Sequence, residues 1–139
     1  MIWNQKFTLE ALNEFGQGNM LEHLGIVFSN YGDDFLEATL PVVNHNKQPV
    51  GLLHGGATAT LAETLGSIAS VLCIKDPNNQ AVGVELNINH LKSAKDGAVT
   101  GRVTAIKVGR KMHVWNIDIR NDKDELISVS RLTTMIISQ

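Results

Sequence analysis

The chain has 139 residues, a net charge of −2 and 19% charged residues. This length predicts one domain, residues 1–139, that folds without disulfides, and the composition is that of an ordinary soluble protein. We expect no membrane span and no targeting segment, because apolar stretches are short and the start lacks a basic region followed by an apolar run. Cys73 is the single cysteine, so an internal disulfide is excluded and a cytoplasmic enzyme or binding domain is expected.

Basic residues gather in one part of the chain. Residues 1–89 contain three basic and nine acidic residues, whereas residues 90–111 contain six basic residues against Asp96 alone. A local excess of positive charge in an acidic protein indicates an anionic ligand more than bulk nucleic acid. The alternative is a set of solvated strand faces and turns.

The first third of the chain predicts a short helix and a hairpin. Thr8 is suited to cap a helix over residues 8–16, and Gly16 is suited to end it in the left-handed conformation. Two apolar runs, 25–31 and 35–42, predict a β-hairpin because residues 36–40 alternate with period two. Residues 43–56 are polar and rich in helix-breaking residues, which predicts a loop.

Residues 57–74 predict one long helix, because they contain no proline and a single charge. Apolar side chains occupy nearly every face, so this helix is expected to be buried on most sides. Four β-segments follow, at 82–89, 98–108, 112–120 and 126–137, and predict an antiparallel meander. The expected fold is therefore α+β, with a curved antiparallel sheet wrapped around one central helix.

A single sheet covers only one side of such a helix. Alanine and glycine positions on the other side would stay open, and pairing with a second copy of the chain would cover them. The sequence therefore predicts a homo-oligomer.

The loop at 48–56, Gln-Pro-Val-Gly-Leu-Leu-His-Gly-Gly, followed by a helix that carries Glu63, resembles the hotdog-fold acyl-CoA thioesterases. The similarity is greatest to bacterial members from the menaquinone and enterobactin pathways, and it spans the chain from Met1-Ile2-Trp3 to 130–134. It implies the hotdog fold, no cofactor, and hydrolysis of an aromatic acyl-CoA such as 1,4-dihydroxy-2-naphthoyl-CoA. It also implies a homotetramer, a dimer of dimers, with active sites at subunit interfaces.

Glu63 is the leading catalytic candidate. An ionised carboxylate in an apolar helix must be paired, reach a wet cavity or have a raised pKa. The small residues around it on the helix favour a pocket, and the alternative is a glutamate reaching solvent from an exposed stripe. The resemblance implies that Glu63 is the nucleophile or the general base, and the sequence does not separate the two roles.

The His54-Gly55-Gly56 turn begins this helix, where unpaired amides suit an oxygen that gains negative charge. The alternatives are a simple loop-to-helix turn and a structural histidine. By resemblance, the Gly55 amide polarises the thioester carbonyl, and Gln48 and His54 line the carbonyl site. Ser67 lies one turn after Glu63 and either assists it or bonds back to its own helix.

The resemblance assigns coenzyme A to the basic part of the chain. The positions implied are Gly83, His90, Leu91, Lys92, Ser93, Lys107, Val108, Gly109, Arg110, Lys111 and Met112. No metal site is expected, since the histidines lack ligand spacing, and no Gly-x-Ser-x-Gly elbow is present. Other readings are a non-hydrolytic acyl-CoA-binding protein, a dehydratase of the same fold, and a proofreading thioesterase that acts on carrier-protein thioesters.

Overall fold

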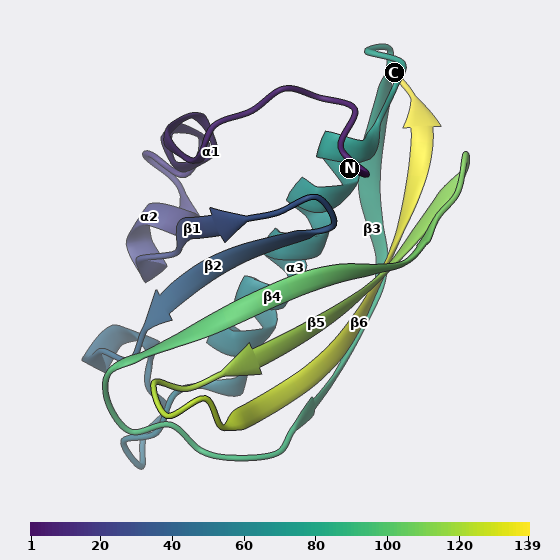
Figure 1. Ribbon diagram of the computed structural model, residues 1–139. Helices are drawn as coiled ribbons and strands as arrows, with labels where there is room; N and C mark the ends of the chain where they lie inside the picture. The colour runs from purple at the N-terminus through teal and green to yellow at the C-terminus, as the bar shows by residue number, and fades with distance from the viewer.

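A long helix, wrapped by a six-stranded antiparallel sheet, dominates the computed structural model, which describes residues 1–139 (Figure 1). The predicted α+β architecture is confirmed. The elements in chain order are α1 (Leu9–Phe15), α2 (Met20–Leu24), β1 (Val27–Tyr31), β2 (Phe35–Pro41), a 3₁₀ turn (Asn44–Asn46), α3 (Gly55–Cys73), β3 (Asn79–His90), β4 (Ala98–Val108), β5 (Met112–Arg120) and β6 (Leu126–Ser138).

The strand order is β1-β2-β4-β5-β6-β3. The β1–β2 hairpin and the β4–β5–β6 meander are confirmed, but the predicted position of β3 beside β4 is wrong. β3 pairs instead with β6, from Asn79 opposite Ser138 to His90 opposite Ser128. Loop 91–97 runs past the strand ends to reach β4 (Figure 1). Its seven residues are long enough, because three strand spacings amount to about 14 Å.

The N-terminal helices differ from the prediction in one respect. Thr8 caps α1 as expected, since its side chain accepts from the amide of Ala11 at 3.1 Å. Gly16 is right-handed at φ −77°, because the chain continues into the unpredicted helix α2. The left-handed conformation occurs instead at Gly18, φ 73°, between the two helices, and at Gly25, φ 78°, which ends α2. At five residues, α2 is too short to show a helical period.

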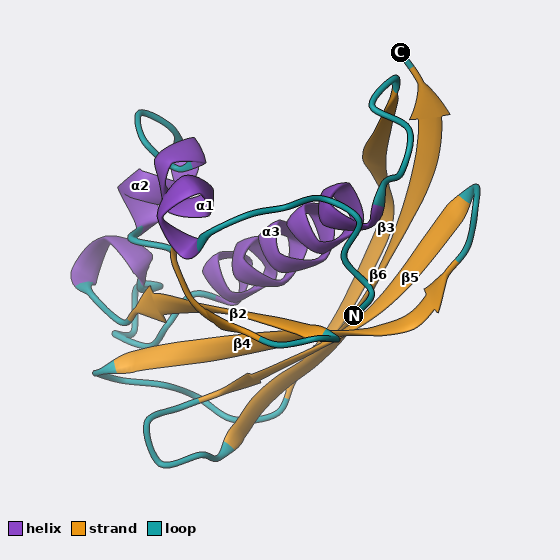
Figure 2. Cartoon of the chain, turned by 45° about the horizontal axis from the view of Figure 1, so that its top comes forward, coloured by secondary structure: helices purple, strands orange, loops and turns teal.

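Helix α3 packs across the concave face of the sheet (Figure 2). Leu61 and Leu65 are fully buried in the same core cluster as Trp115, Ile117 and Leu132. Contrary to expectation, α3 is long and apolar enough, by length and composition, to cross a membrane, although more than half of that stretch is buried inside this fold. The core position of α3 accounts for its apolar composition.

One stripe of α3 is not covered by the sheet. Its members are spaced three and four residues apart and are half-buried or exposed, namely Ala59, Thr60, Glu63, Thr64, Ser67, Ile68 and Val71. Strand β3 is an open edge of the sheet, and Val82 and Val84 on it are 37% and 56% exposed. A bulge between Gly83 and Glu85 interrupts the alternation expected there. That a second chain covers this stripe and this edge stays a prediction.

Candidate active site

The first turn of α3 leaves one backbone amide unpaired. Nδ1 of His54 accepts from the Gly56 amide at 2.7 Å, and the His54 carbonyl accepts from the amides of Ala57 and Thr58 at 3.0 and 3.2 Å. The Gly55 N–H has no such acceptor. A free donor therefore lies at the positive end of the helix. Because Nδ1 is an acceptor, the neutral His54 ring carries its proton on Nε2.

Gly55 lines a cavity of about 320 Å³. Five further residues predicted for the site line it too, namely Gln48, His90, Leu91, Lys92 and Ser93. The rest of the wall was not predicted from the sequence and consists of Leu52, Leu53, Thr58, Ala94 and Ile127. These residues carry no chemical signal in the sequence, because apolar and small side chains occur throughout the core.

Gln48 and His90 line the same cavity as the free amide. Oε1 of Gln48 accepts from the Val50 amide at 2.7 Å, which leaves the side-chain NH₂ of Gln48 free to donate. The His90 ring lies over Gly55, because a Cβ built on Gly55 would be 2.8 Å from Nε2 of His90. Glycine at position 55 thus permits another group to approach the backbone closely, as the His90 ring does.

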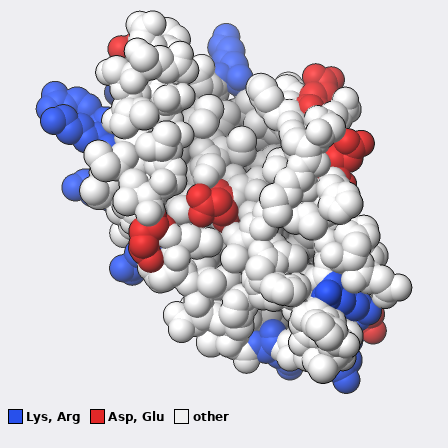
Figure 3. Space-filling model, turned by 180° about the vertical axis from the view of Figure 1, so that it is seen from behind, with Lys and Arg blue, Asp and Glu red and all other residues white.

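Glu63 lies outside this cavity, on the open stripe of α3. Its carboxylate makes no ion pair, and it lies against Gly83 of β3, where a Cβ would be 2.5 Å from Oε1 of Glu63. Burial raises the pKa of Glu63. Seen from behind, this side of the molecule is largely uncharged, with an acidic group in a hollow near its middle (Figure 3).

Ser67, one turn after Glu63, lies on the same stripe. Thr60 and Thr64 donate to carbonyls four residues earlier, at 2.9 and 2.7 Å. Ser67 makes no such bond, so the alternative of a serine bonded back to its own helix is not observed. Its hydroxyl is available to a ligand or a water on the side of Glu63.

The predicted catalytic set has two halves, one around the Gly55 amide and one around Glu63. These halves are separated within one chain. Glu63 is eight residues beyond Gly55, about 12 Å along the axis of α3. Attack on a carbonyl requires reacting atoms about 3–3.5 Å apart. Glu63 does not line the Gly55 cavity, so a thioester held inside that cavity does not meet Glu63 of the same chain.

The basic hairpin tip lies apart from both halves. Val108, Gly109 and Arg110 line a second cavity, of about 340 Å³, together with Cys73 and His113. Cys73 ends α3, about 27 Å from Gly55 along the helix axis. The neighbouring Lys107, Lys111 and Met112 are exposed. The structure therefore does not bring the hairpin to the Gly55 cavity of its own chain.

Two of the titratable groups that line this second cavity, Cys73 and His113, are held in their neutral forms. Burial raises the pKa of the Cys73 thiol to about 11, which agrees with the expected core role. Burial lowers the pKa of His113, and the Gly109 carbonyl partly offsets that effect. Neither group is therefore an activated nucleophile or a fixed cation.

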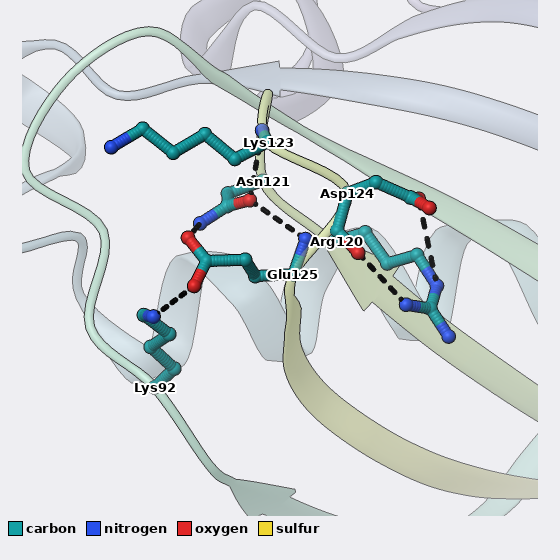
Figure 4. A network of polar contacts seen from close by, with 6 residues as sticks. All are labelled: Lys92, Arg120, Asn121, Lys123, Asp124 and Glu125. Carbon is teal, nitrogen blue, oxygen red and sulfur yellow. Dashed lines mark hydrogen bonds and ion pairs between the residues drawn. The ribbon is translucent and has the colours of Figure 1, made fainter.

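Lys92 at the cavity mouth is not a free cation. Glu125, which the sequence analysis did not single out, accepts from its ammonium group, and Asn121 contacts Glu125 in turn (Figure 4). A charged turn at residues 121–125 is visible in the sequence. Its partner is 33 residues away, so the sequence offered no means of pairing the two.

Comparison with known proteins identifies the family of the chain. The family model of the thioesterase superfamily matches residues 50–128. The 1,4-dihydroxy-2-naphthoyl-CoA hydrolase of Escherichia coli K12 is 50% identical over 137 residues, 99% of this chain and 100% of that protein. The proofreading thioesterase EntH of Cronobacter sakazakii is 46% identical, with 99% of each chain covered.

Solved structures show the same similarity. A crystal structure of a thioesterase from Haemophilus influenzae is 46% identical and superposes with a TM-score of 0.96 over 99% of this chain and 96% of that one. A mutant thioesterase from Pseudomonas aeruginosa is 40% identical, with a TM-score of 0.98 and full coverage of both chains. The chain belongs to the thioesterase superfamily. It is a thioester hydrolase with the hotdog fold.

Proposed function

We propose that this protein hydrolyses acyl-CoA thioesters to a free acid and CoA, and that its substrate is an aromatic acyl-CoA such as 1,4-dihydroxy-2-naphthoyl-CoA. The observation that carries the proposal is the unpaired Gly55 amide, which opens into a cavity beside Gln48. The name of the 50% identical E. coli hydrolase supports this substrate class.

In this mechanism the thioester carbonyl oxygen accepts from the Gly55 N–H, and the Gln48 amide donates beside it. As negative charge grows on that oxygen, the amide at the helix N-terminus stabilises it more strongly. Glu63 then attacks the carbonyl carbon to form an anhydride, which water opens, or it takes a proton from an attacking water. In both routes the carbon–sulfur bond breaks and CoA leaves as the thiol.

The site is proposed to contain two chains. The 12 Å separation of Gly55 and Glu63 supports this, as do the open β3 edge and the open stripe of α3 beside it. Pairing of two β3 edges across a two-fold axis would bring both stripes face to face. Glu63 and Ser67 would then act on a thioester held by Gln48, His54 and Gly55 of the other chain, in a dimer or dimer of dimers.

The carrier is proposed to lie along His90, Leu91, Lys92 and Ser93, with Gly83 and the 107–112 hairpin contributing from neighbouring chains. The pantetheine arm is shared by CoA and carrier proteins, which supports a second candidate, an enzyme that acts on carrier-protein thioesters. The name of the EntH relative supports a proofreading role for that candidate. The lone cysteine supports a cytoplasmic location.

The test is release of free thiol from a panel of thioesters. The panel contains benzoyl-, hydroxynaphthoyl- and medium-chain acyl-CoA, together with the same acyl groups on a carrier protein. We expect the fastest turnover with an aromatic CoA thioester, and Glu63→Gln should abolish turnover while substrate binding persists. No thiol release from any CoA thioester would refute the proposed reaction, and faster turnover of carrier-protein thioesters would favour the second candidate.

A further inference from the structure

The positive charge of Lys92, at the mouth of the Gly55 cavity, is already neutralised by a carboxylate of the same chain. Lys92 borders this cavity and also an adjoining groove. The other charged residues that line this groove are Lys95, Asp96, Asp122, Lys123 and Glu125. Its ammonium group pairs with Oε2 of Glu125 (Figure 4). The two side chains are 50% and 38% exposed, so the pair is open to solvent and to an incoming ligand.

Glu125 is held in place by its own turn. Nδ2 of Asn121 donates to Oε1 of Glu125 at 3.0 Å, and Oδ1 of Asn121 accepts from the Lys123 and Glu125 amides at 3.0 and 2.9 Å. The hydrogen bonds from Lys92 and Asn121 lower the pKa of Glu125, which is therefore ionised at neutral pH. Its negative charge is fixed beside the cavity before any ligand binds.

Lys92 is held from the other side. The amides of Leu91 and Lys92 both donate to the carbonyl of Ile127, at 2.7 and 3.2 Å. The cavity wall at 91–92 and the start of β6 therefore form one connected unit. A ligand phosphate that reaches Lys92 must approach a carboxylate that stays where it is.

We propose that Glu125 is a specificity-determining residue that offsets the charge of Lys92 and so lowers the preference of the enzyme for phosphorylated carriers. The inference rests on the proposed function, in which CoA approaches through this mouth. CoA carries phosphates, whereas a pantetheine-like carrier without its nucleotide carries none. Removing the carboxylate adds one net positive charge at the mouth. This charge attracts the phosphates of CoA and has no effect on a carrier that lacks phosphates.

The experiment compares wild type with Glu125→Gln, which keeps an acceptor for Asn121 and removes the charge. Initial rates are measured with one acyl group on CoA and on N-acetylcysteamine, which has no phosphate. We expect the KM for the CoA thioester to fall about 2- to 5-fold, the size of an exposed ion-pair effect. The KM for the N-acetylcysteamine thioester should not change, and about 1 M salt should remove the difference for CoA.

Asp124→Asn is the matched control. It removes the same charge from the adjacent residue, which lies 4.0 Å from Nε of Arg120 rather than beside Lys92. Asparagine also tolerates the left-handed conformation at this position, where φ is 60°. This variant should keep the wild-type KM for CoA. In Lys92→Gln, adding Glu125→Gln should lower the KM by a smaller factor than in the wild type, because it removes the repulsive carboxylate but frees no ammonium group. A double-mutant cycle measures the difference.

Two outcomes overturn the role of Glu125: an equal KM change for both carriers, and an equal effect of Asp124→Asn. The Kd of CoA, measured by calorimetry in wild type and Glu125→Gln, provides the same comparison without turnover. Absence of hydrolysis in wild type would refute the proposed reaction, whereas unchanged CoA affinity in Glu125→Gln would refute this inference.

Discussion

Glu63 combines two properties that oppose each other. It is half-buried on the open stripe of α3, and no cation or donor in its chain compensates the carboxylate. The folded protein therefore bears a cost for the ionised form, which is the form that the proposed reaction requires. A structural glutamate would be paired or fully solvated, so the unpaired state itself indicates a functional residue.

Glu63→Gln should lower the rate of thioester hydrolysis by about 10²- to 10⁴-fold, the usual contribution of a positioned base. The amide keeps the shape of the side chain and removes both nucleophilicity and basicity. Thiol release under saturating substrate measures the effect. Retention of more than a tenth of the activity would assign the chemistry to another group.

The same substitution should make the protein more stable at neutral pH. The pKa of Glu63 is raised in the folded state, so the folded protein binds its proton more tightly than the unfolded chain does. Stability is then lost as the pH rises from the unfolded pKa of about 4.3 through the raised pKa of the folded protein. Below the unfolded pKa no stability is lost. Denaturant unfolding of both proteins at pH 7 and near pH 4 should show a gain for Glu63→Gln at pH 7 that disappears near pH 4.

Gly83→Ala should reduce kcat by about 10²-fold while leaving the fold intact. The new methyl group would lie 2.5 Å from Oε1 of Glu63, so the carboxylate must move, and a shift of about 1 Å is sufficient for such a loss. Gln80→Ala, an exposed position on the same strand, is the control and should keep wild-type kcat. Equal kcat in both variants would show that the position of the carboxylate is not critical.

At the scale of elements, α3 is fixed on the sheet by close approach and by a buried polar cluster. Nε1 of Trp115 donates to Oγ of Ser70 at 2.6 Å, and the hydroxyls of Ser70 and Thr134 are 2.8 Å apart. Gly66 lies directly on Leu132, with no room for a side chain. These contacts set the rotation of α3, and therefore which of its faces is left open.

Gly66→Ala should destabilise the protein, because its Cβ would overlap the Leu132 side chain and lie 3.2 Å from Cβ of Leu132. Overpacking costs about 1–3 kcal/mol, and the better helix propensity of alanine returns about 1 kcal/mol. Urea unfolding should show the net loss. Ser67→Ala, one residue away on the open stripe, should stay within about 0.5 kcal/mol of wild type.

At the scale of the whole molecule, one chain holds a donor site and a carboxylate site that do not meet. The edge strand β3 and the open stripe of α3 lie next to each other, so one interface would cover both. An interface of this kind makes catalysis depend on assembly. A folded monomer is then expected to be inactive.

Complementation between two inactive chains tests this directly. Co-expressed Gln48→Ala and Glu63→Gln chains form mixed dimers in which one of the two sites has both residues intact. Random assembly makes half of the dimers mixed, so about one quarter of wild-type activity should return. If each chain built its own site, every site would carry one defect, and the mixture would show only the activity of the separate variants.

Local patterns in the sequence determined much of this protein. The period of two in 36–40 and the uninterrupted helical run after Gly55 reflect contacts between near neighbours, so the elements other than α2 and the 3₁₀ turn were predictable within two or three residues. Glu63 and the Gly55 turn were identifiable because a lone acid in an apolar helix and glycines at a helix start are chemically unusual.

Tertiary structure alone decided the rest, because those features depend on residues far apart in the chain. The pairing of β3 with β6 results from how loop 91–97 crosses the sheet end, and no local pattern encodes that path. The free state of the Gly55 amide depends on the bonds that its neighbours make to His54. Likewise, the sequence around Lys92 shows no partner for its charge. Only folding brings Glu125 to Lys92, since 33 residues separate the two charges.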